Sequence, residues 1–260
     1  MPANAVDQPV IEVSVEIAAA PATVWRFFTD PIRFAQWMGD SATLLPEVGG
    51  ALRVGYPGGD IAEGTITAME PERRVEWTWG YAGEGNPVPV GSTVVTITLE
   101  KIDTGTRVTL THAALATAPV RLGHTQGWNA YLSALANAAA LEEQTGRVAE
   151  TIATWCAAWG ITDATARGAA LERCATENVT FDDRYARIAG RTALDAHMAA
   201  AQQMVPGAQV VPDGPPRLCH NHVLYGWRVP GPGDITFMQG TNYAELAPDG
   251  RFVRVVGFWA

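Results

Sequence analysis

The chain has 260 residues, of which 47% are hydrophobic, and it carries a formal net charge of −9. That charge disfavours nucleic acid as a partner, because phosphate backbones are bound mainly through Lys and Arg. No apolar run reaches the ~20 residues that a membrane-spanning helix needs, so we expect no membrane partner. Residues 1–9 lack the basic and apolar segments of a secretory signal, and three widely spaced cysteines argue against a disulfide framework. We therefore expect a cytoplasmic protein with room for two globular domains.

The first half of the chain predicts a strand, two short helices, a series of antiparallel strands and a long helix. Hydrophobic residues alternate with polar ones over 10–18, which is typical of a half-buried strand. Pro21 favours the first turn of a helix, and a second short helix is expected over 32–38. The later strands are expected at 51–56, 61–69, 73–81, 93–102 and 106–114.

The stretch 106–142 changes from the period of a strand to the period of a helix. Val108, Leu110 and His112 share one face of the strand. From Gly123 onward the apolar residues follow helical spacing, and they form one stripe of Trp128, Tyr131, Leu132, Leu135 and Ala139. A last strand followed by a long amphipathic helix predicts a helix laid across a curved sheet, with His112 on the covered face.

The second half predicts three helices and then a sheet. Helices are expected over 146–160, from 162 and from 192, with a short strand at 179–181 between the last two. The Pro/Gly-rich segment 206–216 is expected to be a connector, and long strands are expected at 217–229, 234–246 and 251–259. Residues 1–145 carry 8 Lys or Arg and 16 Asp or Glu, against 10 and 11 in the rest. This shift supports a division into domains at 1–144 and 145–260.

Several short sequences in the first half occur together in a recognisable order. They are P-A-T-V-W at 21–25, T-D-P at 29–31, P-E-V-G-G-A-L-R-V at 46–54, P-E-R-R-V at 71–75 and G-W at 127–128. The series resembles the START-like (SRPBCC) superfamily, in the branch related to the activator of heat-shock-protein ATPase. The resemblance implies a helix-grip fold, with an antiparallel sheet wrapped on the long helix and a hydrophobic cavity between them.

The second half carries a different series. V-T-F-D-D at 179–183, G-R-T-A-L at 190–194, G-T-N at 240–242 and D-G-R-F-V-R-V-V-G-F at 249–258 resemble the SnoaL-like branch of the nuclear transport factor two-like superfamily. The resemblance implies an α+β cone, with three helices on a curled antiparallel sheet. Members include cyclases, isomerase relatives and binding modules, so the fold does not fix the function. Such cones often dimerise through the open sheet, so we expect a homodimer through this domain.

Candidate site residues in the first domain are one histidine and four tryptophans. His112 would act in the cavity as a general base or hydrogen-bond donor, or it is a satisfied histidine of the core. The aromatic side chains that could form a ligand-binding wall, or belong to the core, are Trp37, Trp77, Trp79 and Trp128. Glu63 is expected to point outward, because an inward carboxylate is costly unless it is paired.

In the second domain, His220 and His222 share one face of the predicted strand 217–229. Zinc uses such ligands, but no third and fourth ligand is evident, so we expect no metal and no other cofactor. Both histidines remain candidates for acid–base chemistry.

Asp183, together with Tyr185 and Tyr243, could transfer protons in an apolar pocket, as carboxylates and a tyrosine do in ketosteroid isomerase. The alternative for Asp183 is a turn carboxylate, and its neighbour Asp182 is an equal candidate. Asn242 lies where many relatives carry an acid. It cannot act as a general base, but it could orient a ligand.

Three functions are compatible with these residues. The first is a two-domain protein that binds hydrophobic small molecules in apolar cavities, in a binding or accessory role. The second is an enzyme of the cyclase, dehydratase or isomerase type that uses histidine and aspartate on an apolar, polyketide-like substrate. The third is a chaperone co-factor. It ranks last, because nothing in the sequence supplies a separate chaperone-binding domain.

Overall fold

The structure is a computed structural model that describes residues 10–233 and 235–260. Two predictions fall outside the described residues. They are the absence of a secretory signal in residues 1–9 and the start of a strand at Asp234. The chain divides into two compact units, Met1–Glu143 and Gln144–Ala260. Within the described ranges, no helix is long and apolar enough to cross a membrane.

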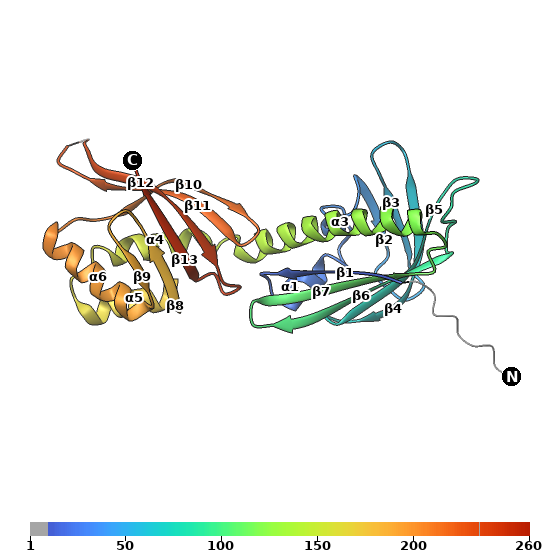
Figure 1. Ribbon diagram of the computed structural model, residues 1–260, viewed down its shortest axis with the longest axis horizontal. Helices are drawn as coiled ribbons and strands as arrows, with labels where there is room; N and C mark the ends of the chain where they lie inside the picture. Colours follow the sequence, from blue (N-terminus) through green and yellow to red (C-terminus); the bar gives the residue numbers. More distant parts are fainter. Residues whose placement is uncertain (1–9, 234) are drawn as a thin grey trace. The chain divides into compact units, whose positions relative to one another are not determined.

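The first unit is a seven-stranded antiparallel sheet packed on a long helix (Figure 1). Its elements in chain order are β1 (Ile11–Ile17), α1 (Pro21–Arg26), α2 (Pro31–Phe34), β2 (Ser41–Leu44), β3 (Ala51–Gly55), β4 (Ile61–Glu70), β5 (Arg74–Tyr81), β6 (Thr93–Ile102), β7 (Gly105–Ala113) and α3 (Ala118–Gln144). The strands lie in the order β1-β7-β6-β5-β4-β3-β2. The helix-grip architecture is confirmed. The short strand β2 was not predicted, and α3 begins at Ala118, earlier than the predicted helical segment.

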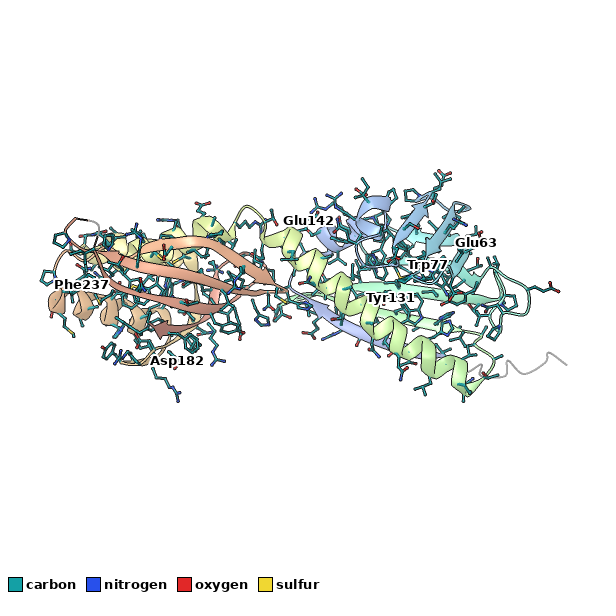
Figure 2. The ribbon with its side chains drawn as sticks, turned by 90° about the horizontal axis from the view of Figure 1, so that it is seen from above. Glu63, Trp77, Tyr131, Glu142, Asp182 and Phe237 are labelled. Atoms are coloured by element: carbon teal, nitrogen blue, oxygen red, sulfur yellow. The ribbon has the colours of Figure 1, made fainter. Side chains whose placement is uncertain are left out.

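The core of the first unit forms where the stripe of α3 meets the inward face of the sheet. Val108, Leu110 and His112 of β7 are fully buried, as the alternation along this strand predicts. Opposite them, α3 buries Trp128, Leu132, Leu135 and Ala139. Figure 2 labels Tyr131 on α3 and Trp77 and Glu63 on the strands beside it. Trp77 is fully buried, whereas the Glu63 side chain is partly exposed. Glu63 pairs there with Arg53 across β3 and β4 (3.2 Å).

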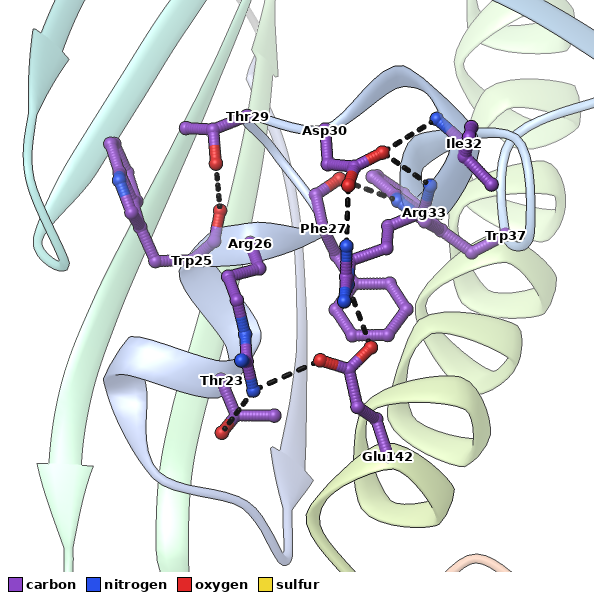
Figure 3. Close-up of polar contacts among 10 residues, drawn as sticks. All are labelled: Thr23, Trp25, Arg26, Phe27, Thr29, Asp30, Ile32, Arg33, Trp37 and Glu142. Atoms are coloured by element: carbon purple, nitrogen blue, oxygen red, sulfur yellow. Dashed lines mark hydrogen bonds and ion pairs between the residues drawn. The ribbon is translucent and has the colours of Figure 1, made fainter. Parts of the chain in front are cut away.

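A charged network ties the end of α3 to the two short helices (Figure 3). Glu142 of α3 contacts Arg26 at 2.9 Å and Arg33 at 2.7 Å. Arg33 also pairs with Asp30, which caps α2 by accepting the backbone N–H groups of Ile32 and Arg33. Because these side chains are partly exposed, each pair contributes only about 0.2–1 kcal/mol. The network therefore fixes the position of α3 more than it stabilises the unit.

The second unit places three helices against a curled six-stranded sheet (Figure 1). Its elements are α4 (Val148–Ala158), α5 (Ala164–Cys174), β8 (Ala175–Asp182), β9 (Arg187–Ala189), α6 (Arg191–Met204), β10 (Val211–Cys219), β11 (His222–Pro230), β12 (Thr236–Leu246) and β13 (Phe252–Trp259). The strand order is β10-β11-β12-β13-β8-β9. The α+β architecture is confirmed. The sheet is antiparallel except for the pair β13 and β8, which is parallel.

Two expectations for the end of the second unit are wrong. The Pro/Gly-rich segment is not simply a connector, because residues from Val211 onward form strand β10. Its prolines are tolerated because β10 is an edge strand, where a missing N–H breaks few ladder hydrogen bonds. The predicted strand 217–229 is in fact a hairpin, since Cys219 pairs with His222 and the chain turns between them. His220 lies in that turn with a φ of 53°.

The second core is also aromatic. Trp155 packs edge-on against Phe252 at 5.3 Å between ring centroids, and Tyr225 stacks on Phe252 at 5.8 Å. Burial raises the pKa of the Cys156 and Cys174 thiols to about 12. Both are free cysteines inside this core, so they act as small apolar residues.

Candidate ligand site

A cavity of about 560 Å³ opens beside β5 and α3 in the first unit. Its aromatic lining residues are Tyr56, Trp79, Tyr81, His124, Trp128 and Tyr131. The remaining lining residues are Pro57, Asp60, Asn86, Pro87, Val88, Pro119, Val120, Gly123 and Gly127. The strand and helix periods explain this lining, because β5 presents every second residue and α3 presents every third or fourth. A mostly apolar cavity with a few polar groups is typical of a small-molecule site.

Five of these aromatic rings contact one another in a closed cycle. The centroid distances are 6.3 Å from Tyr56 to Tyr81, 6.0 Å from Tyr81 to Trp79 and 5.6 Å from Trp79 to Trp128. The cycle closes with 6.2 Å from Trp128 to Tyr131 and 5.9 Å from Tyr131 to Tyr56. The rings are tilted or edge-on to their neighbours, which is the favoured geometry for aromatic pairs. The two tryptophans and three tyrosines therefore support one another as a cavity wall.

A chain of hydrogen bonds lies directly behind this wall. The indole N–H of Trp128 donates to Nδ1 of His112 at 3.0 Å. Nδ1 is therefore the unprotonated nitrogen, and Nε2 carries the proton that it donates to the Thr93 hydroxyl at 2.8 Å. The Thr93 hydroxyl in turn donates to the backbone carbonyl of Trp79 at 2.8 Å. His112 thus links the two tryptophans of the wall.

His112 is neutral in this arrangement. It is fully buried, and burial together with the nearby His124 lowers its pKa from 6.5 to about 3. Both ring nitrogens are already used in hydrogen bonds, so neither is available to a ligand. The geometry is that of a positioning residue behind the cavity.

His124 differs from His112, because it lines the cavity itself. Its Nδ1 donates to the carbonyl of Val120 at 2.9 Å, one turn earlier in α3. Its Nε2 is buried and has no hydrogen-bond partner within the described part of the chain. The Trp79 indole N–H is also buried and makes no hydrogen bond of normal geometry with the described residues. It lies near the Tyr81 hydroxyl, where it acts to lower the pKa of Tyr81 against the larger, raising effect of burial. Buried unpaired polar atoms are unusual, and a ligand could satisfy them.

The three tyrosines of the cycle stay protonated. Burial raises the pKa of Tyr56 and of Tyr81, and burial together with Asp40 raises that of Tyr131. Their hydroxyls are therefore neutral groups that can both donate and accept hydrogen bonds.

The carboxylate of Asp183 in the second unit accepts hydrogen bonds that hold a turn. Its Oδ1 accepts the backbone N–H groups of Tyr185 and Ala186, both at 2.8 Å, and its Oδ2 accepts the indole N–H of Trp259 at 3.2 Å. Tyr185 is 69% exposed and packs its ring on Trp259. Asp182 instead pairs at the surface with Arg187.

Asn242 is buried, with both ends of its side-chain amide bonded. Its oxygen accepts from the indole of Trp227 and its nitrogen donates to the hydroxyl of Tyr225, both at 3.0 Å. Gly257 separates it from Asp183, since a Cβ there would lie 3.3 Å from Asn242 Oδ1 and from Asp183 Cβ. Asn242 and Asp183 are thus neighbours.

His222 and Tyr243 form a separate pair on β11 and β12. The Tyr243 hydroxyl lies 2.8 Å from His222 Nδ1 and donates to Glu245 at 3.0 Å. Because successive side chains of a strand alternate, Tyr243 and Asn242 point to opposite faces. His220 does not share a strand face with His222, since it lies in the hairpin turn. No group of three His, Cys, Asp or Glu side chains suited to a metal occurs among the described residues.

A second cavity, of about 340 Å³, lies over β10, β11 and β12 and includes Asp213, Arg217 and Gln239 in its lining. None of the predicted site residues lines it.

Comparison with known proteins identifies the family of the first unit. Residues 18–140 match the family model described as activator of Hsp90 ATPase homolog 1-like protein (AHSA1). The chain is also 34% identical to an AHSA1-like protein from Rhizobium etli, over 51% of this chain and 82% of that one, with a TM-score of 0.43. The first unit belongs to the AHSA1-like family. No curated protein matches the chain significantly.

Two further solved structures are similar. One is a SnoaL-like family protein from Agrobacterium tumefaciens, with 27% identity, coverage of 46% of this chain and 98% of that one, and a TM-score of 0.41. The other is an Aha1 dimer from Colwellia psychrerythraea, with 22% identity, coverage of 49% and 93%, and a TM-score of 0.42. The resemblances inferred from the sequence are thus found for both halves of the chain.

In the AHSA1-like unit, Trp79 and Trp128 line the cavity, and His112 lies behind them. Trp37 and Trp77 do not line it. Trp37 donates its indole N–H to the carbonyl of Phe27 at 3.2 Å, and Trp77 packs on Phe34, so both belong to the core.

Four cavity residues of the AHSA1-like unit were not predicted as ligand-binding candidates, namely Tyr56, Tyr81, His124 and Tyr131. Spacing could have found three of them. Tyr81 lies two residues after Trp79 in β5, and His124, Trp128 and Tyr131 follow at i, i+4 and i+7 in α3. Tyr56 carries no such signal.

Proposed function

We propose that the chain is a ligand-binding or accessory protein that holds a hydrophobic, aromatic small molecule in the cavity of its AHSA1-like unit. The observation that carries this proposal is the closed cycle of five aromatic rings around a cavity of about 560 Å³. Rings that contact one another cannot collapse into the cavity without losing those contacts, so the site is preformed. We treat the second compact unit as a separate domain with its own function.

The energetics favour an apolar ligand. Each Å² of apolar surface removed from water contributes roughly 25 cal/mol, so a ligand that buries about 200 Å² gains about 5 kcal/mol. Loss of translational and rotational freedom opposes this gain, and a preformed wall keeps the remaining cost of ordering side chains small. The Nε2 of His124, which has no hydrogen-bond partner among the described residues, adds specificity for a ligand that carries a hydrogen-bond donor.

An acid–base enzyme of the cyclase, dehydratase or isomerase type is the second candidate. One observation favours it, namely that His124 lines the cavity and its buried Nε2 has no hydrogen-bond partner among the described residues. Such an enzyme would use His124 rather than His112, because both nitrogens of His112 are bonded. A His124→Gln variant separates the two functions. A binding protein keeps its ligand affinity within a few fold, whereas an enzyme loses turnover.

We also propose a homodimer through the second unit. Leu224 of β11 and Phe258 of β13 are exposed, at 37% and 59% of their surface. Light scattering on the purified chain tests this directly. A dimer that a Phe258→Ser variant converts to monomer supports the proposal, and a monomeric wild type contradicts it.

Native mass spectrometry of the purified chain tests the ligand-binding function. We expect a small-molecule adduct on the wild type, and we expect its loss in a Gly127→Leu variant. A Cβ at Gly127 meets only the Tyr131 ring, at 3.9 Å, so a leucine there projects into the cavity without displacing backbone. A wild type that carries no adduct and binds no aromatic compound in titration overturns the proposal. An adduct that persists in the variant places the ligand elsewhere.

A further inference from the structure

The charged side chains that line the cavity are negative and not positive. Asp60 lines the cavity and is exposed, so its carboxylate stands at the opening. Neither Lys nor Arg is among the described residues that line the cavity. Asp40 also acts on this site, because its charge contributes to the raised pKa of Tyr131. An anionic ligand would find no counter-charge here, whereas a positive ligand would find one.

The cycle of rings has the dimensions of a cation site. Its five centroid distances of 6.3, 6.0, 5.6, 6.2 and 5.9 Å place the centroids no more than about 5 Å, root-mean-square, from their common centre. A cation attracts an aromatic ring over distances up to about 6 Å from the centroid, and tryptophan is the strongest partner. One positive group can therefore lie within range of two tryptophans and three tyrosines together.

Several of the remaining polar atoms are hydrogen-bond acceptors, which suit a protonated amine. Because Nδ1 of His124 donates to the carbonyl of Val120, its Nε2 is the nitrogen that can accept a hydrogen bond from a ligand N–H group. The hydroxyl oxygens of the tyrosines are acceptors as well. A cation that enters an apolar cavity loses its hydration, and this cost must be offset by ring faces, acceptors or a carboxylate. The cavity provides aromatic rings, tyrosine hydroxyl oxygens and the carboxylate of Asp60.

We propose that this cavity binds an organic cation, namely a quaternary or protonated amine attached to an apolar group, with the positive charge inside the cycle of five rings. The inference rests on the proposed function, since it names the chemical class of the ligand for the same site. The cycle holds the ammonium group, Asp60 supplies the counter-charge at the opening, and the apolar group fills the rest of the cavity.

A matched pair of probes tests the charge alone. Benzyltrimethylammonium and neopentylbenzene have the same shape and differ by one nitrogen in place of one carbon. Isothermal titration of the full chain should give a dissociation constant at least tenfold lower for the cation. Tyr131→Leu, which removes one ring of the cycle but keeps an apolar side chain, should weaken the cation several fold more than the neutral probe. Tyr131→Phe keeps the ring and should retain most of the difference in affinity between the two probes.

A pair of carboxylate variants supplies the control. Asp60→Asn should weaken the cation several fold and leave the neutral probe unchanged. Glu63→Gln removes the same charge from the outward face of β4, where Glu63 pairs with Arg53, and should change neither probe. Equal or tighter binding of the neutral probe overturns the inference and leaves the proposed function intact. Failure of both probes also overturns the inference, and the proposed function falls only if native mass spectrometry finds no other ligand.

Discussion

The indole N–H of Trp128 on α3 donates to Nδ1 of His112 on β7 at 3.0 Å, and both side chains are buried. This bond joins the helix to the sheet directly behind the cavity. It also decides the tautomer of His112, and through Thr93 it extends to the backbone of Trp79. His112, which the sequence offered either as a general base or as a satisfied core histidine, is thus a structural link between two walls of the cavity.

Replacement of Trp128 by Phe tests this link. The variant leaves His112 Nδ1 buried without a donor, which costs about 1–3 kcal/mol in addition to the loss of ring volume. Trp77→Phe is a matched control, because Trp77 is equally buried and its indole N–H has no partner among the described residues. We expect urea unfolding to show that Trp128→Phe loses about 1–3 kcal/mol more of the free energy of unfolding than Trp77→Phe does. Equal losses would mean that the hydrogen bond adds nothing.

The pKa of His112 predicts a pH-dependent stability. Because this pKa falls from 6.5 to about 3 on folding, the unfolded chain takes up a proton at pH values where the folded chain does not. The stability from the neutral His112 is complete above pH 6.5 and is lost as the pH falls toward 3, at up to about 1.4 kcal/mol per pH unit.

A His112→Asn variant should lack this contribution, although it will be less stable at neutral pH. The measurement is the free energy of unfolding of both proteins between pH 7 and 4. Carboxylates titrate in both proteins, so the difference between the two curves isolates His112. Parallel curves would show that His112 does not change its protonation on folding.

Two glycines in α3 are predicted to lower the stability of the helix while they leave room for the cavity. Gly123 and Gly127 both line the cavity, and a Cβ at Gly123 would meet no atom within 4 Å. Glycine inside a helix costs about 0.8–1 kcal/mol relative to alanine. We therefore expect Gly123→Ala to raise the stability of the first unit by up to about 1 kcal/mol, measured by thermal unfolding. A lower melting temperature would show that the backbone at Gly123 depends on glycine.

Asp183 is predicted to be structural. Asp183→Asn places an amide where Oδ2 accepts the Trp259 N–H, and it weakens a turn in which Oδ1 accepts two backbone N–H groups. We expect a loss of about 1–3 kcal/mol in the second unit and a change in tryptophan fluorescence.

Asp182→Asn is the control for Asp183, because Asp182 pairs with Arg187, whose side chain is 91% exposed. Its loss should be at most about 1 kcal/mol. A stable Asp183→Asn protein that has lost a catalytic activity would contradict the structural role.

The sequence predicted the elements that follow a clear period and missed what depends on contacts between distant segments. Alternation in β5 and the stripe of α3 placed Trp79 and Trp128 on the buried faces, and these two residues line the cavity. Tyr56 could not be found in this way, because it joins the site only through its contacts with Tyr81 and Tyr131 on other elements.

Local chemistry misled the prediction in two places. The prolines of β10 suggested a connector, because proline is rare in strands, but an edge strand tolerates them. His220 and His222 were predicted on one strand face because the alternation of the sequence continues through the two-residue turn, which contains His220. Periodicity also could not distinguish Trp77 in the core from Trp79 in the cavity wall, since both point inward from β5.

The indole N–H resonances of the tryptophans report most directly on whether the ligand lies within the aromatic cycle of the first unit. In a two-dimensional ¹H–¹⁵N spectrum of the full chain, titration with benzyltrimethylammonium should shift the signals of Trp79 and Trp128. The signals of Trp155 and Trp259 in the second unit should stay in place, and Gly127→Leu should abolish the shifts. Shifts confined to the second unit, or unchanged shifts in the variant, would contradict the account.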